Sequence, residues 1–327
     1  MKHWMGLLFM AGLMVWVVAA LPVNPAAAAP VAPGLSASVA PAEIIPGQAG
    51  YVHVSGGYPL AVTVTMDGQP LDIFWAGSGY EGLFSFGLDA QPGEHMLAID
   101  ATNLTTGETL SRTETVTVTA FDFRNEQVSI PYRLQDLLDP KLNQSELDRL
   151  SAVYAGRTQP ARLDWPFAIP VPGGIVTSRF GGNRVYNGGV LAARHAGVDF
   201  RRAIGEPVLA TADGRVALAD TLSIRGNVIV LDHGYGVFSQ YAHLSQILVQ
   251  PNQFVRRGEV IGLAGATGRA NGPHLHFEVI VNGNPVDPLK WLALAPGFIP
   301  PREATPIPQT DGSGGGDTGG SVPTPGG

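Results

Sequence analysis

Short runs of β-branched and aromatic residues, separated by glycine and proline, extend through most of this sequence. The 42 glycines and 27 prolines among 327 residues interrupt the chain too often for many long helices. Hydrophobic residues make up 45% of the chain and charged residues only 14%, so there is enough apolar material to build packed cores. The pattern therefore predicts a mainly β protein, and the length favours two domains.

Charge and cysteine content exclude several classes of function. The formal net charge is −7, which argues against a nucleic-acid partner because phosphate recognition needs a basic surface. The chain has no cysteine, so disulfides, thiol nucleophiles and thiolate metal sites are excluded. Any transition-metal site must be built from histidine, aspartate or glutamate.

Residues 1–29 have the features of a secretory signal peptide. One positive charge precedes an apolar run, which ends at two prolines and a stretch of small residues. We expect cleavage after Ala29 and export to the periplasm, the cell wall or the medium. An uncleaved segment would instead anchor the protein in a membrane, since about 20 apolar residues can span a bilayer.

Residues 34–123 predict an N-terminal immunoglobulin-like β-sandwich. Alternating strand patterns occur at 51–55, 62–66 and 113–120, and Asp67-Gly68 is a favourable hairpin turn. Such a domain would either direct the protein to the cell wall or inhibit the second domain, and its residues favour neither role.

Residues 124–164 form a predicted connector with one short helix, whose N-cap is expected at Asn143 or Ser145. The β pattern returns over residues 165–294, and the Pro- and Gly-rich tail, 295–327, is expected to be disordered. Three apolar residues lie at helical spacing in the connector and are expected to pack on a neighbouring domain: Leu147, Leu150 and Tyr154.

Five of the eight histidines lie between residues 195 and 276. Two of them begin the run 274–281, which is rich in β-branched residues and bounded by turn residues, so it predicts a strand. Residues two apart in a strand project from the same face, so His274 and His276 would stand side by side. Leu275 and Phe277 would face the other layer. Two adjacent imidazoles indicate a shared task.

Two further arrangements are weak when taken alone. His195 and Asp199 are four residues apart, and the small residues Ala196 and Gly197 between them leave room for a bulky neighbour such as a metal ion. The run 237–244 predicts another strand, with Tyr241 and His243 on one face. His233 lies in a predicted turn and is interpreted as structural.

Taken together in chain order, the segments around His195, His243 and His274 resemble those of the lysostaphin/LytM-type zinc metallopeptidases, a family of peptidoglycan endopeptidases. The resemblance covers about residues 165–294 and includes glycine-containing framing segments such as 178–181 and 265–268. It implies a C-terminal antiparallel β-sheet peptidase domain with a groove. It also implies one zinc ion bound by His195, Asp199 and His276, with His243 and His274 in catalysis.

The chemistry of these residues agrees with that implication. Three nitrogen or oxygen ligands with an open fourth position are typical of catalytic zinc, which lowers the pKa of bound water to about 7. One of His243 and His274 would accept a proton from that water, and the other would stabilise the oxyanion or protonate the leaving amine. The sequence leaves their assignment open. Arg184 and Tyr186, in a predicted loop, are expected to contact substrate, and Glu278 is expected to orient a ligand histidine.

The sequence thus predicts a secreted zinc metalloendopeptidase that hydrolyses amide bonds in the peptide cross-links of peptidoglycan. The alternative is a non-catalytic member of the same fold that binds peptidoglycan or activates an amidase. A peptidase acting on glycine-rich proteins is a third hypothesis. No sequence feature predicts an oligomeric state.

Overall fold

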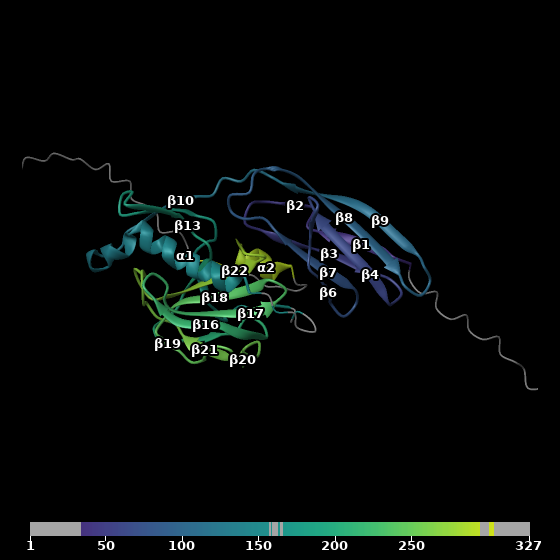
Figure 1. The fold of residues 1–327 in the computed structure, drawn as a ribbon. Coiled ribbons are helices and arrows are strands. Elements are labelled where there is room, and N and C mark those ends of the chain that lie inside the picture. Colours follow the sequence, from purple (N-terminus) through teal and green to yellow (C-terminus); the bar gives the residue numbers. More distant parts are fainter. Residues whose placement is uncertain (1–33, 157, 159–162, 164–165, 295–300, 304–327) are drawn as a thin grey trace, which may run out of the picture. The chain divides into compact units, whose positions relative to one another are not determined.

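The computed structural model describes residues 34–156, 158, 163, 166–294 and 301–303. The predicted signal peptide and most of the predicted tail lie outside the described residues. Within these ranges, no helix combines the length and apolar character needed to cross a membrane. Strands dominate the fold, as predicted, and one longer helix lies on the second group of strands (Figure 1).

The first group of strands forms two sheets. One sheet has the order β1 (Ser36–Ala40), β3 (Ala49–Ser55), β7 (Tyr80–Ser85), β6 (Ile73–Trp75). The other has the order β2 (Glu43–Ile44), β9 (Thr109–Val118), β8 (Gly93–Asn103), β4 (Leu60–Met66), β5 (Gln69–Pro70). Lettered along the chain, the first sheet is A-B-E-D and the second contains G-F-C, which is the immunoglobulin order. The predicted sandwich therefore has the expected topology.

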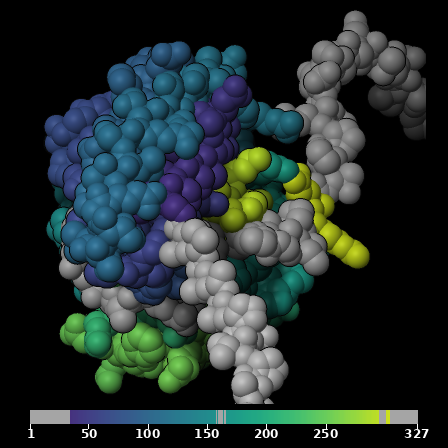
Figure 2. Space-filling model, turned by 90° about the vertical axis from the view of Figure 1, so that its right-hand side faces the viewer, coloured from purple at the N-terminus to yellow at the C-terminus, as the bar shows by residue number. Residues whose placement is uncertain are grey.

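Apolar residues that alternate along the strands pack the two sheets against each other. Val52 and Val54 from β3 and Leu97 and Ile99 from β8 share one buried core. The predicted strands 51–55 and 62–66 fall in β3 and β4, and the predicted strand 113–120 overlaps β9 but extends two residues beyond its end at Val118. Asp67 and Gly68 form a two-residue turn between β4 and β5, with φ of 49° and 78°, as a type I′ hairpin requires. The sandwich residues form the continuous purple-to-blue surface in Figure 2.

The second group of strands is built on a nine-stranded sheet. Eight strands follow the order β20 (Phe254–Val255), β16 (Gly214–Leu222), β17 (Gly226–Gly234), β18 (Val237–Leu244), β22 (His274–Val281), β14 (Val198–Arg201), β11 (Ile175–Ser178), β24 (Arg302–Glu303), and β23 (Asn284–Val286) pairs with β22. All pairs are antiparallel, as expected, except that β24 runs parallel to β11. A smaller sheet holds β15 (Pro207–Leu209), β21 (Val260–Leu263) and β19 (Gln246–Ile247), and α2 (Pro288–Ala293) follows β23.

The central strands of this sheet are covered on both faces. Every residue of β18 is buried. Tyr241 and Phe277 belong to the main core on one face. Phe238 and Ile280 pack on the opposite face with Leu150 of the connector helix. A sheet buried on both faces holds its strands rigidly, which makes it a precise support for side chains at strand ends.

The connector differs from its prediction at its start. Its helix, α1 (Pro140–Tyr154), begins before Asn143 and Ser145, which were wrong as N-caps. The cap is Asp139, whose carboxylate accepts a hydrogen bond from the backbone N–H of Lys141 at 2.8 Å. Asp followed by Pro combines a favourable N-cap with a favourable first helical residue. Leu150 is buried against the sheet and Tyr154 packs beside it, as predicted, but Leu147 is 37% exposed, so the prediction was wrong for that residue.

Before α1, the connector adds two elements that the sequence did not suggest. A short 3-10 helix, η1, covers Tyr132–Leu138, and β10 covers Asn125–Val128. β10 pairs in parallel with β12 (Asn183–Tyr186), and β12 pairs with β13 (Leu191–Arg194). The segment 183–194, predicted to be a loop, is therefore a hairpin in a three-stranded sheet.

Candidate metal centre

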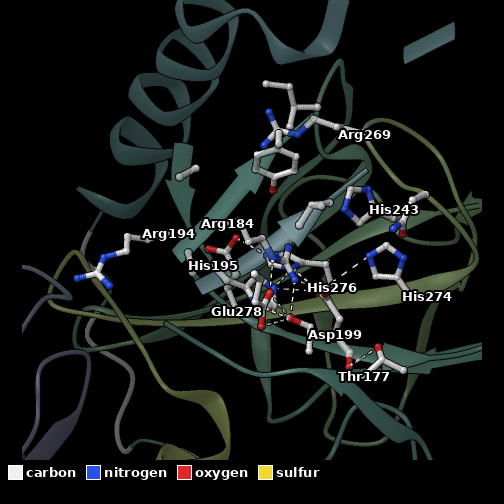
Figure 3. A pocket seen from close by; sticks show the side chains of 18 of the residues that line it. Thr177, Arg184, Arg194, His195, Asp199, His243, Arg269, His274, His276 and Glu278 are labelled. Atoms are coloured by element: carbon white, nitrogen blue, oxygen red, sulfur yellow. Dashed lines mark hydrogen bonds and ion pairs between the residues drawn. The ribbon is translucent and has the colours of Figure 1, made fainter. Parts of the chain in front are cut away.

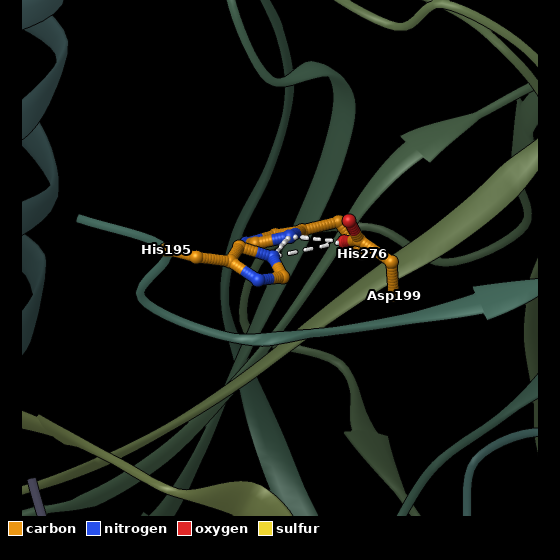
Figure 4. A group of neighbouring side chains, drawn as sticks. All are labelled: His195, Asp199 and His276. Atoms are coloured by element: carbon orange, nitrogen blue, oxygen red, sulfur yellow. Dashed lines mark hydrogen bonds and ion pairs between the residues drawn. The ribbon is translucent and has the colours of Figure 1, made fainter. Parts of the chain in front are cut away.

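His276 and Asp199 are opposite one another on neighbouring strands. The register of β14 and β22 pairs them directly, and His276 Nδ1 lies 2.8 Å from Asp199 Oδ1. His195 lies in the turn before β14, and its Nε2 is 3.1 Å from both of these atoms. All three side chains are buried, and they converge on one point (Figure 4).

Hydrogen bonds fix the tautomers of both imidazoles. His195 Nδ1 lies 2.7 Å from the backbone carbonyl of Arg179, and His276 Nε2 lies 2.8 Å from Glu278 Oε1. In the neutral rings these two nitrogens can carry the protons, since carbonyl and carboxylate oxygens only accept, and His195 Nε2 and His276 Nδ1 can then present lone pairs to a cation in place of their hydrogen bonds to Asp199. Lone pairs of two imidazoles and Asp199 then face one another.

Such an arrangement fits a cation. In a tetrahedral zinc site with bonds of roughly 2.0–2.1 Å, ligand atoms are about 3.3 Å apart, close to the separations of 2.8 to 3.1 Å found here. The donor set, two neutral imidazoles and one carboxylate, is also one that zinc uses. The predicted residues therefore fit the predicted metal.

The electrostatics of the cluster also favour a cation. Burial raises the pKa of Asp199, but His195 and Arg184 outweigh it and hold this pKa well below its usual range. Burial likewise raises the pKa of Glu278, but the hydrogen bond from His276 has the larger opposite effect, so this pKa is lower than usual. Both carboxylates are therefore ionised at neutral pH. Two buried negative charges attract a positive partner.

His243 and His274 flank this cluster (Figure 3). Each donates a hydrogen bond from Nδ1 to a backbone carbonyl, His243 to Thr267 at 2.8 Å and His274 to Gly272 at 2.9 Å. The Nε2 of His243 is left for the groove, whereas the Nε2 of His274 lies 3.9 Å from Asp199 Oδ1. The two ring centroids are 4.8 Å apart. Burial, followed by the nearby His274 and His276, lowers the pKa of His243 well below its usual value. His243 is therefore neutral at pH 7.

Two expectations about neighbours of these residues were wrong. Tyr241 does not share a face with His243, because His243 has a φ of 63° and its side chain leaves the strand alternation. Tyr241 lies in the core, where its hydroxyl contacts Ser239 at 2.9 Å. Gly197 does not make room for a metal: a Cβ there would lie 2.4 Å from the backbone carbonyl of Phe277, so it accommodates β22.

Arg184, predicted to contact substrate, is directed at Asp199. Its Nη2 donates to Asp199 Oδ2 at 2.6 Å and to Ser178 Oγ at 2.7 Å, and its Nε donates to Glu126 Oε2 at 3.1 Å. Glu126 lies on β10, far away in sequence, and no local pattern pointed to it. Tyr186, the other predicted contact residue, is buried and forms part of the groove wall.

The five predicted metal and catalytic residues line one groove of about 1950 Å³. His233 does not line it, and its ring nitrogens instead contact the backbone carbonyl of Asp213 and Ser239 Oγ. Three converging side chains that could hold a metal, beside two further imidazoles in one groove, are the combination of groups that metallohydrolases use.

Comparison with known proteins agrees with this class. Residues 193–288 match the profile of peptidase family M23, and the C-terminal region of the chain belongs to that family. The resemblance to lysostaphin/LytM-type peptidases is thereby confirmed. A crystal structure from Pseudomonas aeruginosa assigned to peptidase M23 has a TM-score of 0.55 and 29% identity, covering 76% of this chain and 94% of that one.

Two curated relatives match over shorter segments. The peptidoglycan DD-endopeptidase ShyA of Vibrio cholerae is 41% identical over 128 residues, which are 39% of this chain and 30% of that protein. The DD-carboxypeptidase/endopeptidase Mpg of Neisseria meningitidis is 45% identical over 95 residues, 29% of this chain and 22% of that protein. The matched segments span less than a third of these relatives.

Proposed function

We propose that this chain is an exported zinc metalloendopeptidase that hydrolyses amide bonds in the peptide cross-links of peptidoglycan. The observation that carries the proposal is the convergence of His195 Nε2, His276 Nδ1 and Asp199 Oδ1, with the Nε2 atoms of His243 and His274 beside them. The names of the curated relatives support peptidoglycan as the substrate. Export is inferred from residues 1–29.

In this mechanism His195, Asp199 and His276 hold the metal. Zinc bound there would polarise the scissile carbonyl and make a water molecule acidic enough to attack it near neutral pH. His243 is neutral, so its Nε2 accepts the proton of the attacking water and passes it to the leaving amine. His274, in the form protonated on both ring nitrogens, donates a hydrogen bond from Nε2 to the developing oxyanion while Nδ1 donates to the carbonyl of Gly272.

Two further residues orient the ligands. Glu278 fixes the ring of His276 through its hydrogen bond to Nε2. Arg184 fixes Asp199 through Oδ2, which leaves Oδ1 for the metal. We therefore assign Arg184 a positioning role in place of the substrate contact expected from the sequence.

Digestion of purified sacculi tests the proposal. The full chain, with zinc, should release peptide fragments identifiable by mass spectrometry, and should contain one zinc per chain. His243→Ala and His274→Ala should keep the zinc and lose turnover, whereas His276→Ala should lose both. Sacculus binding without released fragments would support the non-catalytic alternative, and full activity of His274→Ala would overturn its catalytic role.

A further inference from the structure

Two arginines line the groove beside His243. Arg225 lies in the turn between β16 and β17, and its backbone carbonyl accepts a hydrogen bond from the N–H of His243 at 2.8 Å. Arg269 is tied to the same turn, because its backbone N–H donates to the carbonyl of Ile224 at 2.8 Å. Backbone hydrogen bonds thus tie the segments that carry both arginines to a predicted catalytic residue, and Figure 3 shows Arg269 in the same pocket as His243.

Protein carboxylates do not balance the charge of this pair. Among the described residues, Arg269 has no carboxylate partner: its Nη1 donates to the carbonyl of Leu137 at 3.1 Å, and its guanidinium lies 4.7 Å from the ring centroid of Tyr186. Arg225 forms an ion pair with the buried Glu146, whose Oε2 is 3.8 Å from its Nη1, so one carboxylate faces two guanidinium groups and one positive charge is left over. Glu146 already accepts from two backbone N–H groups.

The two arginines are also close enough to repel one another. Burial lowers the pKa of Arg269, and the positive charges of Arg225 and Arg184 also lower it, although the neighbouring Tyr186 acts in the opposite direction. The protein as a whole has a net charge of −7, so this local excess of positive charge is not a general property of its surface.

Attachment of the connector does not explain the pair. Arg269 contacts η1 and Arg225 approaches α1, but a guanidinium has five N–H donors and these contacts use few of them. Two like charges held together in a partly buried wall oppose folding. Apolar side chains would attach the connector without that cost, so the arrangement indicates an anionic ligand.

We propose that Arg225 and Arg269 form a subsite for a free carboxylate of the substrate, on a residue next to the scissile bond. This inference rests on the proposed function and narrows its substrate class to carboxylate-bearing peptides, as opposed to neutral glycine-type peptides. Guanidinium groups bind carboxylates through paired hydrogen bonds that ammonium groups cannot reproduce. The subsite lies beside His243, so the carboxylate and the scissile bond occupy the groove together.

Matched peptides test the proposal by cleavage. The parent peptide carries a cross-link bond with free carboxylates on both flanking residues, and each carboxylate is converted to a carboxamide in turn. With the full zinc-loaded chain, one of the two amidations should lower kcat/KM by about 10- to 100-fold, since a charge-assisted hydrogen bond contributes roughly 1.5–3 kcal/mol. Arg269→Gln should abolish that difference while retaining one zinc per chain.

Arg256→Gln is the matched control, because Arg256 is exposed and does not line the groove. It removes the same charge and should keep the discrimination of the wild type. Arg225→Gln provides a second variant if Arg269→Gln does not fold. Equal cleavage of all three peptides by the wild type, or unchanged discrimination in both groove variants, would overturn the proposal.

A binding measurement separates this inference from the proposed function. Fluorescence anisotropy of labelled peptides reports affinity for the chain with or without hydrolysis. Tighter binding of the carboxylate form, lost in Arg269→Gln, would support the subsite even if no peptide were cleaved. Cleavage of sacculi with no preference for the carboxylate in either assay would refute the subsite alone.

Discussion

Replacement of Glu278 by glutamine removes a negative charge behind a predicted zinc ligand with almost no change in volume. Glu278 is 3% exposed, and its Oε1 accepts hydrogen bonds from His276 Nε2 at 2.8 Å and Gln240 Nε2 at 2.7 Å. A glutamine at 278 still offers one oxygen, so the ring of His276 keeps a neutral acceptor. The charge-assisted character of the bond is lost.

The size of the effect follows from that exchange. A hydrogen bond to a charged acceptor contributes about 1.5–3 kcal/mol and a neutral one about 0.5–1.5 kcal/mol. The difference, about 1–1.5 kcal/mol, corresponds to a zinc affinity lower by roughly tenfold. Loss of a fixed ring orientation adds to this, so we expect a decrease of about 10- to 100-fold.

Zinc affinity is measured by competition with a chromophoric chelator at neutral pH. Glu43→Gln is the control, since Glu43 is exposed on β2 in the sandwich and the substitution removes the same charge. Thermal unfolding of the metal-free variants checks that the fold is intact. A zinc affinity of Glu278→Gln within twofold of the wild type would refute the role assigned to Glu278.

Three further predictions concern the same centre. Arg184→Gln removes the 2.6 Å partner of Asp199 Oδ2, so zinc affinity measured with the chelator should fall about tenfold; an unchanged affinity would argue against positioning. Gly197→Ala places a Cβ 2.4 Å from the backbone oxygen of Phe277 and should lower the free energy of unfolding in urea by about 1–3 kcal/mol; a stability equal to wild type would mean that the strands separate at little cost. Burial lowers the pKa of His276, but hydrogen bonds to two carboxylates outweigh it and raise this pKa above 6.5. Protons therefore compete with the metal as the pH falls through that raised pKa, and the zinc affinity measured with the chelator should fall over that range; an affinity that does not change with pH there would contradict this.

Local patterns were sufficient where the chemistry depends on strand geometry. The alternation in 274–281 placed His274 and His276 on the groove side and Leu275 in the core, as the structure shows. The alternation failed at His243, because a single left-handed backbone conformation turns one side chain and leaves no period in the sequence. Strand patterns therefore predict faces only while the backbone stays extended.

Contacts between distant segments were not predictable in the same way. Glu126 accepts a hydrogen bond from Arg184 because β10 pairs in parallel with β12. Parallel strands are not joined by a short hairpin turn, so no turn signal in the sequence indicates this pairing. The start of α1, in contrast, could have been predicted from the sequence. Asp139-Pro140 is a favourable helix start, but Asn143 and Ser145, which lie inside the helix, were preferred as N-caps. That error was one of interpretation.

The parallel strand β10 has a consequence for how this protein can be divided. It supplies Glu126 to Arg184, which in turn orients Asp199, while the family match itself begins only at residue 193. A fragment that begins at residue 193 would lack both Glu126 and Arg184. An exchange of the sandwich for another domain must therefore keep the connector together with the second group of strands.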